Sequence, residues 1–170
     1  MRIDDCIHTF DDLALKVLPE HFQKLELSLR AQWPAELFSR TGFGSTAVAK
    51  HLGFSGDFSG CYVLSEPSRP VYVGISRKVL TRVRQHMLGK THFDASLAYS
   101  IAQRKCPTGG QRSVAMEAEC FKAAFSEAQA YLRSLHVAAV QIDNPLELYV
   151  FEAFASMALG TSEWNTFRTH

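Results

Sequence analysis

The sequence lacks a long apolar run and carries almost no net charge. No stretch approaches the roughly 18 consecutive apolar residues that a membrane-spanning helix needs, so no membrane segment is expected. A formal net charge of +1 over 170 residues argues against a protein that coats nucleic acid by bulk electrostatic attraction. The chain also opens without the apolar core of a signal peptide, and we expect a cytoplasmic protein.

Cysteines are few and their spacing follows no metal-binding pattern. The four are Cys6, Cys61, Cys106 and Cys120, and none forms a CxxC pair. A structural zinc site is therefore not expected. Free thiols in a reducing compartment fit this spacing best.

The length of the chain limits the number of domains. A sequence of 170 residues with 46% hydrophobic content fits one domain with a core, but not two of typical size. We predict a helical N-terminal extension over residues 1–57 and a domain over residues 58–170. A helical insertion is expected within that domain at about residues 91–135.

Acidic residues are absent between Pro67 and Phe93, although the chain as a whole is nearly neutral. The basic residues there are Arg69, Arg77, Lys78, Arg82, Arg84 and Lys90, beside His86. Such a cluster is either a solvated helix face or a surface that contacts nucleic acid.

Two short apolar runs separated by turn residues predict a β-hairpin. Residues 60–64 and 71–75 are rich in Val, Ile, Tyr and Cys, and the segment between them contains two prolines. Tyr62 and Tyr72 would then lie on neighbouring strands. The apolar spacing that follows predicts a helix over residues 77–88.

Further periodicities predict a mixed fold. The expected helices cover residues 9–31 as two short helices interrupted by Pro19, residues 47–52, residues 94–104, residues 112–135 as one long amphipathic helix, and a last helix that begins at Pro145. A third strand is expected over residues 137–142. The fold class is therefore α/β (α+β), with a small central sheet of about three strands flanked by helices. The apolar stripe of the long helix fits core packing or, alternatively, a dimer seam.

The hairpin and three later positions together resemble the GIY-YIG nuclease family. Gly60-Cys61-Tyr62 and Tyr72-Val73-Gly74 are similar to the two motifs that give the family its name. Arg82, ten residues after Tyr72, matches the family's active-site arginine. Glu152 matches its metal-binding glutamate, and Asn165, thirteen residues later, matches its late asparagine.

The resemblance, over residues 58–170, implies a metal-dependent endonuclease that hydrolyses DNA phosphodiester bonds. Glu152 would bind Mg²⁺ or Mn²⁺, which prefer oxygen ligands and need few of them from the protein. Arg82 would hold the scissile phosphate. Tyr62 or His86 would act as general base, and Tyr72 would form a hydrogen bond at the phosphate.

DNA contacts are expected from Arg77, Lys78, Arg84 and Asn165. Changing the three basic residues to alanine should lower the affinity for DNA with little effect on folding. Asn165 would mainly tie the end of the chain to the site.

Glu147 competes with Glu152 for the role of metal ligand. Asn144 as helix N-cap and Glu147 three residues later resemble a capping box, which gives Glu147 a structural role. Glu152 is therefore the preferred ligand.

Two other functions stay open. The chain is alternatively a catalytically inactive nucleic-acid-binding module of the same fold, or a protein-interaction domain that uses the long amphipathic helix. A protein partner or a homodimer would use the N-terminal extension or the helix over residues 112–135. Catalysis requires Tyr62, Tyr72, Arg82 and Glu152 to converge on one cleft.

Overall fold

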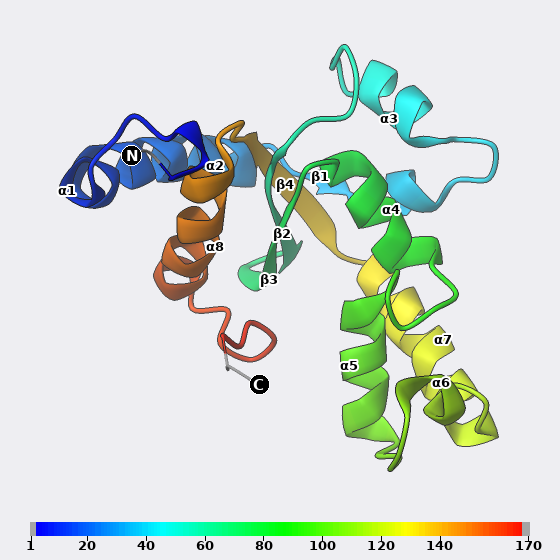
Figure 1. Ribbon diagram of the computed structural model, residues 1–170. Coiled ribbons are helices and arrows are strands. Elements are labelled where there is room, and N and C mark those ends of the chain that lie inside the picture. Colours follow the sequence, from blue (N-terminus) through cyan, green and yellow to red (C-terminus); the bar gives the residue numbers. More distant parts are fainter. Residues whose placement is uncertain (1–2, 168–170) are drawn as a thin grey trace. The chain divides into compact units, whose positions relative to one another are not determined.

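The computed structural model describes residues 3–167, and its internal contacts divide the chain into two compact units (Figure 1). The first unit combines the described residues up to Trp33 with Phe58–Val79 and with the described residues from His136 onward. The second unit combines Pro34–Asp57 and Leu80–Leu135. Each unit is therefore assembled from segments that are distant in sequence.

The first unit is built on an antiparallel hairpin. Strand β2 (Gly60–Glu66) pairs with β3 (Arg69–Ser76) on one side and with β4 (His136–Gln141) on the other. A two-residue strand β1 (Trp33–Pro34) completes the sheet order β1-β4-β2-β3. The predicted hairpin and third strand are confirmed. The strands run further than predicted, because Glu66 still pairs with Arg69 and the turn shortens to two residues.

Two helices cover one face of this sheet (Figure 1). They are α2 (Leu18–Arg30) and α8 (Pro145–Leu159), and both contribute to a core that includes Cys61 and Val63 of β2. Side chains alternate along a strand, so Tyr62 and its neighbour Leu64 point to the opposite face. The mixed α+β class is confirmed.

The N-terminal helices form one continuous run instead of two short helices separated by Pro19. After the 3-10 turn η1 (Ile3–Asp5), the run passes from α1 (Phe10–Asp12) through a π-helical turn, η2 (Leu13–Val17), into α2. The N–H of Leu18 bonds to the carbonyl of Leu13, five residues back. Pro19 is the second residue after this π-turn, and the wider turn accommodates both the missing N–H and the proline ring inside the run.

Helix α8 begins as predicted, but Glu147 does not complete a capping box. The Asn144 side chain accepts a hydrogen bond from the Glu147 N–H at 3.1 Å, and Pro145 stands at the first helical position. The Glu147 carboxylate instead contacts Nε2 of His21 at 3.0 Å and Nε2 of His8 at 3.7 Å. Glu147 thus holds the N-terminal segment against α8.

The second unit is helical. It contains η3 (Ala35–Ser39), α3 (Ser45–His51), α4 (Val79–Leu88) from its second residue on, α5 (Ser96–Lys105), α6 (Arg112–Ala115) and α7 (Glu119–Arg133). Helices α5 and α7 lie side by side (Figure 1). The apolar stripe of α7, including Phe121, Phe125 and Leu132, is buried in this unit and is therefore core.

The single long helix predicted over residues 112–135 is wrong. The chain leaves helical geometry at Ala118, whose extended backbone (ψ 133°) caps the start of α7. A disulfide between Cys106, at the end of α5, and Cys120, in the first turn of α7, also corrects the expectation of four free thiols. Cys6 and Cys61 are free and buried.

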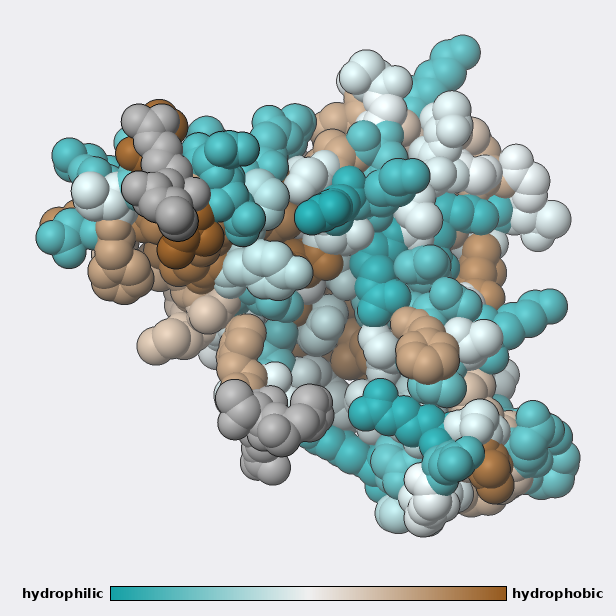
Figure 2. All heavy atoms as spheres, viewed as in Figure 1, coloured by the Kyte–Doolittle hydropathy of each residue, from teal (hydrophilic) through white to brown (hydrophobic). Residues whose placement is uncertain are grey.

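Apolar side chains are exposed on the N-terminal segment. Ile3, Ile7 and Phe10 expose 67, 67 and 73% of their surface, and Figure 2 shows apolar atoms over α1. No helix within residues 3–167 is long and apolar enough to cross a membrane.

Candidate active site

Tyr62 and Tyr72 lie together on the sheet face opposite to α2 and α8. Their ring centroids are 6.2 Å apart and the rings are tilted by 52°. Tyr72 pairs with Leu64 and Tyr62 with Gly74, so both side chains project from the same face. Tyr62 is 1% exposed and Tyr72 is half-buried. The two tyrosines thus form one cluster.

Gly74 makes room for the Tyr62 phenol. A Cβ atom at residue 74 would lie 2.4 Å from both Cζ and Oη of Tyr62, a distance that real Cβ atoms do not adopt. The glycine of the second motif is therefore a packing requirement of the tyrosine in the first. Sequence reasoning missed this contact, although the hairpin register that pairs residues 62 and 74 carries the signal for it.

Asn165 clasps the backbone of β3 beside this cluster. Its Oδ1 accepts a hydrogen bond from the Val73 N–H at 2.9 Å, and its Nδ2 donates to the Val73 carbonyl at 2.7 Å. Val73 lies between Tyr72 and Gly74 on the edge strand of the sheet. The amide therefore ties the end of the chain to the hairpin, and the substrate contact expected of it stays a prediction.

Glu152 belongs to α8 and is half-buried. Burial raises the pKa of its carboxyl group. The charge of Glu152 acts on the Cys61 thiol, whose pKa is raised by burial and, to a smaller degree, by Glu152. Because Cys61 and Tyr62 are consecutive strand residues, Glu152 is on the helix that packs against the face opposite to the tyrosines.

The surroundings of Glu152 fit a cation. Within residues 3–167 its carboxylate forms no hydrogen bond or ion pair, so it is free to bind a proton or a metal ion. No group of three or more His, Cys, Asp or Glu side chains in that range is arranged to hold a metal. A single carboxylate matches a cation that keeps most of its water ligands, as Mg²⁺ does.

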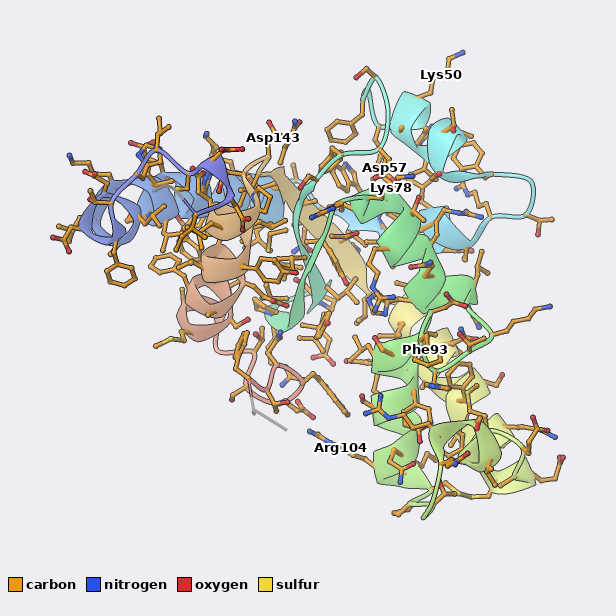
Figure 3. All side chains as sticks on the ribbon, viewed as in Figure 1. Lys50, Asp57, Lys78, Phe93, Arg104 and Asp143 are labelled. Atoms are coloured by element: carbon orange, nitrogen blue, oxygen red, sulfur yellow. A yellow bond between two sulfur atoms is a disulfide. The ribbon has the colours of Figure 1, made fainter. Side chains whose placement is uncertain are left out.

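Arg82 belongs to the second unit, where it holds together the connection between α4 and α5. Its Nη1 donates to the carbonyl of Asp94 at 2.8 Å, and its Nη2 donates to Oγ of Ser96 at 2.7 Å. Nη1 also reaches the carbonyl of Phe93, which Figure 3 labels in this connection, at 3.3 Å. A phosphate would meet a guanidinium that already has structural partners, and the phosphate contact stays a prediction.

His86 is fully buried in α4, with 0% exposure. Burial, and secondarily the charge of Arg82, lowers the pKa of its imidazole to about 3. At neutral pH the ring is uncharged and a weak base. Of the two candidate general bases, His86 is therefore the less favoured on electrostatic grounds.

The three basic residues expected at DNA differ in their surroundings. Arg84 is half-buried, and its Nη1 donates to the carbonyls of Phe38, at 2.7 Å, and Phe43. Arg77 and Lys78 are exposed, and within residues 3–167 their side chains have no hydrogen-bond or ion-pair partner. The expectation that replacing Arg84 would leave folding unaffected is at odds with these contacts.

No family model, curated protein or solved structure matches this chain. The resemblance to the GIY-YIG nucleases therefore rests on the quoted residues. Of these, Tyr62, Tyr72, Glu152 and Asn165 belong to the first unit, and Arg82 belongs to the second.

Proposed function

We propose that this chain is a metal-dependent endonuclease that hydrolyses DNA phosphodiester bonds with a GIY-YIG-type active site. One observation carries the inference: the two hairpin motifs and the late asparagine, chosen by resemblance from separate parts of the sequence, meet in one structural cluster. Glu152 is not part of this cluster, because α8 packs against the other face of the sheet, and the convergence of all four catalytic candidates on one cleft stays a prediction. The Tyr62 phenol lies over Gly74, and Asn165 binds the backbone of Val73 between Gly74 and Tyr72. The packing of Tyr62 on Gly74 and the hydrogen bonds of Asn165 to Val73 thus involve the same hairpin residues that carry the resemblance.

In this mechanism the tyrosines position the reacting groups. A phenol with a reference pKa of about 10 is a poor base near neutrality, so Tyr62 would orient the attacking water instead of removing its proton. Because Tyr62 is 1% exposed, this role requires its phenol to become accessible when substrate binds. Tyr72, half-buried on the neighbouring strand, donates a hydrogen bond to a phosphate oxygen. The charge neutralisation on the phosphoryl group that the resemblance assigns to Arg82 stays a prediction, because Arg82 belongs to the second unit.

Glu152 is the residue that would hold Mg²⁺ or Mn²⁺. The cation supplies Lewis-acid activation of the phosphate and of water when bound. The raised pKa of the Glu152 carboxyl supports this role, because a half-buried carboxylate without a partner gains free energy when a cation neutralises it. DNA is the proposed partner, and the cytoplasm stays the proposed location.

A second candidate function is nucleic-acid binding without turnover. Two observations favour it: the Arg82 guanidinium is engaged with Asp94 and Ser96, and His86 is fully buried. A protein that retained the fold and lost catalysis would tolerate both features. Binding would then depend on the exposed Arg77 and Lys78.

Incubating the purified protein with supercoiled, linear, branched and single-stranded DNA separates the two functions. Each substrate is tested with Mg²⁺, with Mn²⁺ and with a chelator. An endonuclease gives nicked or shortened products with 5′-phosphate and 3′-hydroxyl ends that disappear in chelator. A binding module retards the DNA in a native gel and gives no product with any metal.

A further inference from the structure

A pocket of about 270 Å³ opens in the first unit where the sheet ends beside α8. Its lining residues are Ser59, Ile75, Ser76, Arg77, Asp143, Pro145, Leu148 and Tyr149. They come from the residue before β2, the end of β3 and the residue after it, the turn between β4 and α8, and the first turns of α8. Figure 3 shows Asp143 at the turn between β4 and α8.

The backbone around this pocket is held by strand pairing. Gly60 pairs with Ser76 on one side and with Gln141 on the other. A Cβ atom at residue 60 would lie 2.1 Å from the Val140 carbonyl oxygen, so the strands approach as closely as a glycine allows. The Ile142 N–H also donates to the Ser59 carbonyl at 3.0 Å. The pocket is therefore bordered by the hydrogen-bonded ends of three strands.

Four features of the lining point to one class of ligand. Ile75, Pro145 and Leu148 give an apolar wall. Tyr149 adds an aromatic ring that is 67% exposed. Arg77 adds an exposed guanidinium that has no hydrogen-bond or ion-pair partner within residues 3–167.

Asp143 adds the fourth feature, a carboxylate that can accept hydrogen bonds from a ligand. Its Oδ1 accepts a hydrogen bond from Gln141 at 2.9 Å, and its other oxygen accepts none from residues 3–167. A simple anion would be repelled by this carboxylate, and an apolar peptide would leave both charges without partners. A nucleotide uses every feature, because it joins a flat base with N–H donors to a phosphate.

We propose that this pocket binds one unpaired nucleotide of a nucleic-acid strand, with its base stacked on Tyr149 and its phosphate at Arg77. Aromatic stacking of an unpaired base together with a cation on the backbone is a general mode of single-strand recognition. Asp143 accepts from an exocyclic amine or ring N–H of the base. Lys78, the residue after Arg77, is also an exposed cation.

This inference rests on the proposed function, since it identifies the substrate class: DNA with a single-stranded tail or branch. A free nucleotide carries the same chemistry, so the test must separate the two sources. Anisotropy measurements in chelator compare a tailed duplex, a blunt duplex and single-stranded DNA, and saturation-transfer NMR measures a mononucleotide. Chelator removes cleavage from the comparison.

Tailed and single-stranded DNA should bind about tenfold more tightly than blunt duplex, and Tyr149→Ala should remove most of that preference. Tyr149→Phe should retain it, because stacking survives without the hydroxyl group. Arg77→Ala should lower the affinity for tailed DNA several-fold, and it should reduce the salt dependence of that affinity by about one phosphate contact. Met157→Ala, at an 83% exposed apolar residue of the same helix, is the control and should change nothing.

Equal affinity for tailed and blunt DNA, or full binding by Tyr149→Ala, would overturn the inference. A mononucleotide that binds as tightly as tailed DNA would assign the pocket to free nucleotides and overturn it as well. Cleavage assays with Mg²⁺ keep the two proposals apart. Cleavage without a preference for tails contradicts only the pocket, whereas tail preference without any cleavage contradicts only the nuclease.

Discussion

The phenol of Tyr62 lies across Gly74, so that the two motifs of the hairpin form one packing unit. A Cβ atom at residue 74 would come within 2.4 Å of the Cζ and Oη atoms of Tyr62. Tyr62 is 1% exposed and has no solvent side toward which to move. The glycine is therefore needed wherever the tyrosine is kept.

Changing Gly74 to alanine should destabilise the protein by about 1–3 kcal/mol, because the added methyl group overpacks a filled site. Urea denaturation of Gly74→Ala measures this loss. In a Tyr62→Leu background the same change should lower the free energy of unfolding much less, since the phenol is gone. Gly109→Ala is the control, because a Cβ there meets nothing within 4 Å. Equal penalties in both backgrounds would mean that the glycine has another role.

Replacing Asn165 should loosen the edge of the sheet. Asn165→Ala removes both hydrogen bonds to Val73 and should cost about 1–2 kcal/mol. Asn165→Asp should cost more at neutral pH, because a carboxylate oxygen would replace the amide that donates to the Val73 carbonyl. Folding should raise the pKa of that new carboxyl group, so stability should recover as the pH falls and the group becomes protonated. If stability does not change in either variant, the clasp contributes nothing.

Arg84→Ala should unfold more easily than Arg77→Ala. Removing the Arg84 guanidinium leaves the carbonyls of Phe38 and Phe43 without their donor, a loss of about 1–3 kcal/mol. Arg77 is exposed, so its replacement should stay within about 0.5 kcal/mol of the native stability and lower only the affinity for DNA. Thermal or urea unfolding together with DNA titration distinguishes the two. A destabilised Arg77→Ala with an unchanged Arg84→Ala would reverse the assignment.

Local patterns predicted the elements better than they predicted the environment of the charged residues. The hairpin, β4 and the start of α8 follow from runs of a few residues with turn or capping chemistry at their ends. Arg82 and His86 are four residues apart, a spacing that puts both on one helix face, and nothing local shows whether that face is buried. Burial comes from segments distant in sequence, and it turns His86 into a neutral interior residue.

Two other predictions, the single long helix and the free thiols, are wrong because they too depend on contacts between segments distant in sequence. The apolar stripe continues through residues 116–118, so periodicity could not reveal the break between α6 and α7. Cys106 and Cys120 are 14 residues apart, and only the folding of α7 back along α5 brings them together.

The buried His86 should make the protein sensitive to acid. Its folded pKa of about 3 lies below the unfolded value near 6.5, so the unfolded state binds more protons between these two pH values. Stability should therefore fall as the pH drops below about 6.5, with a contribution approaching about 1.4 kcal/mol per pH unit from this one site. Urea denaturation at several pH values measures the slope, and His86→Leu should flatten it. An equal slope in that variant would contradict the assignment.

Glu152 should show the opposite dependence on pH. Its folded pKa is raised by burial, so ionisation opposes folding at pH values above that pKa, and the penalty disappears as the pH falls toward the ordinary glutamate range. Glu152→Gln should accordingly be as stable as the native protein or slightly more stable at neutral pH. Glu147→Gln should be less stable, because the Glu147 carboxylate bonds to His21 at 3.0 Å.

These two variants provide the most direct test of the nuclease. Cleavage of DNA is measured for the native protein, Glu152→Gln and Glu147→Gln with Mg²⁺, with Mn²⁺ and with chelator, after circular dichroism shows that all three are folded. Metal-dependent cleavage by the native protein and by Glu147→Gln, together with its loss in Glu152→Gln, is the expected result. Full metal-dependent cleavage by Glu152→Gln, or no cleavage of any DNA by the native protein, would contradict it.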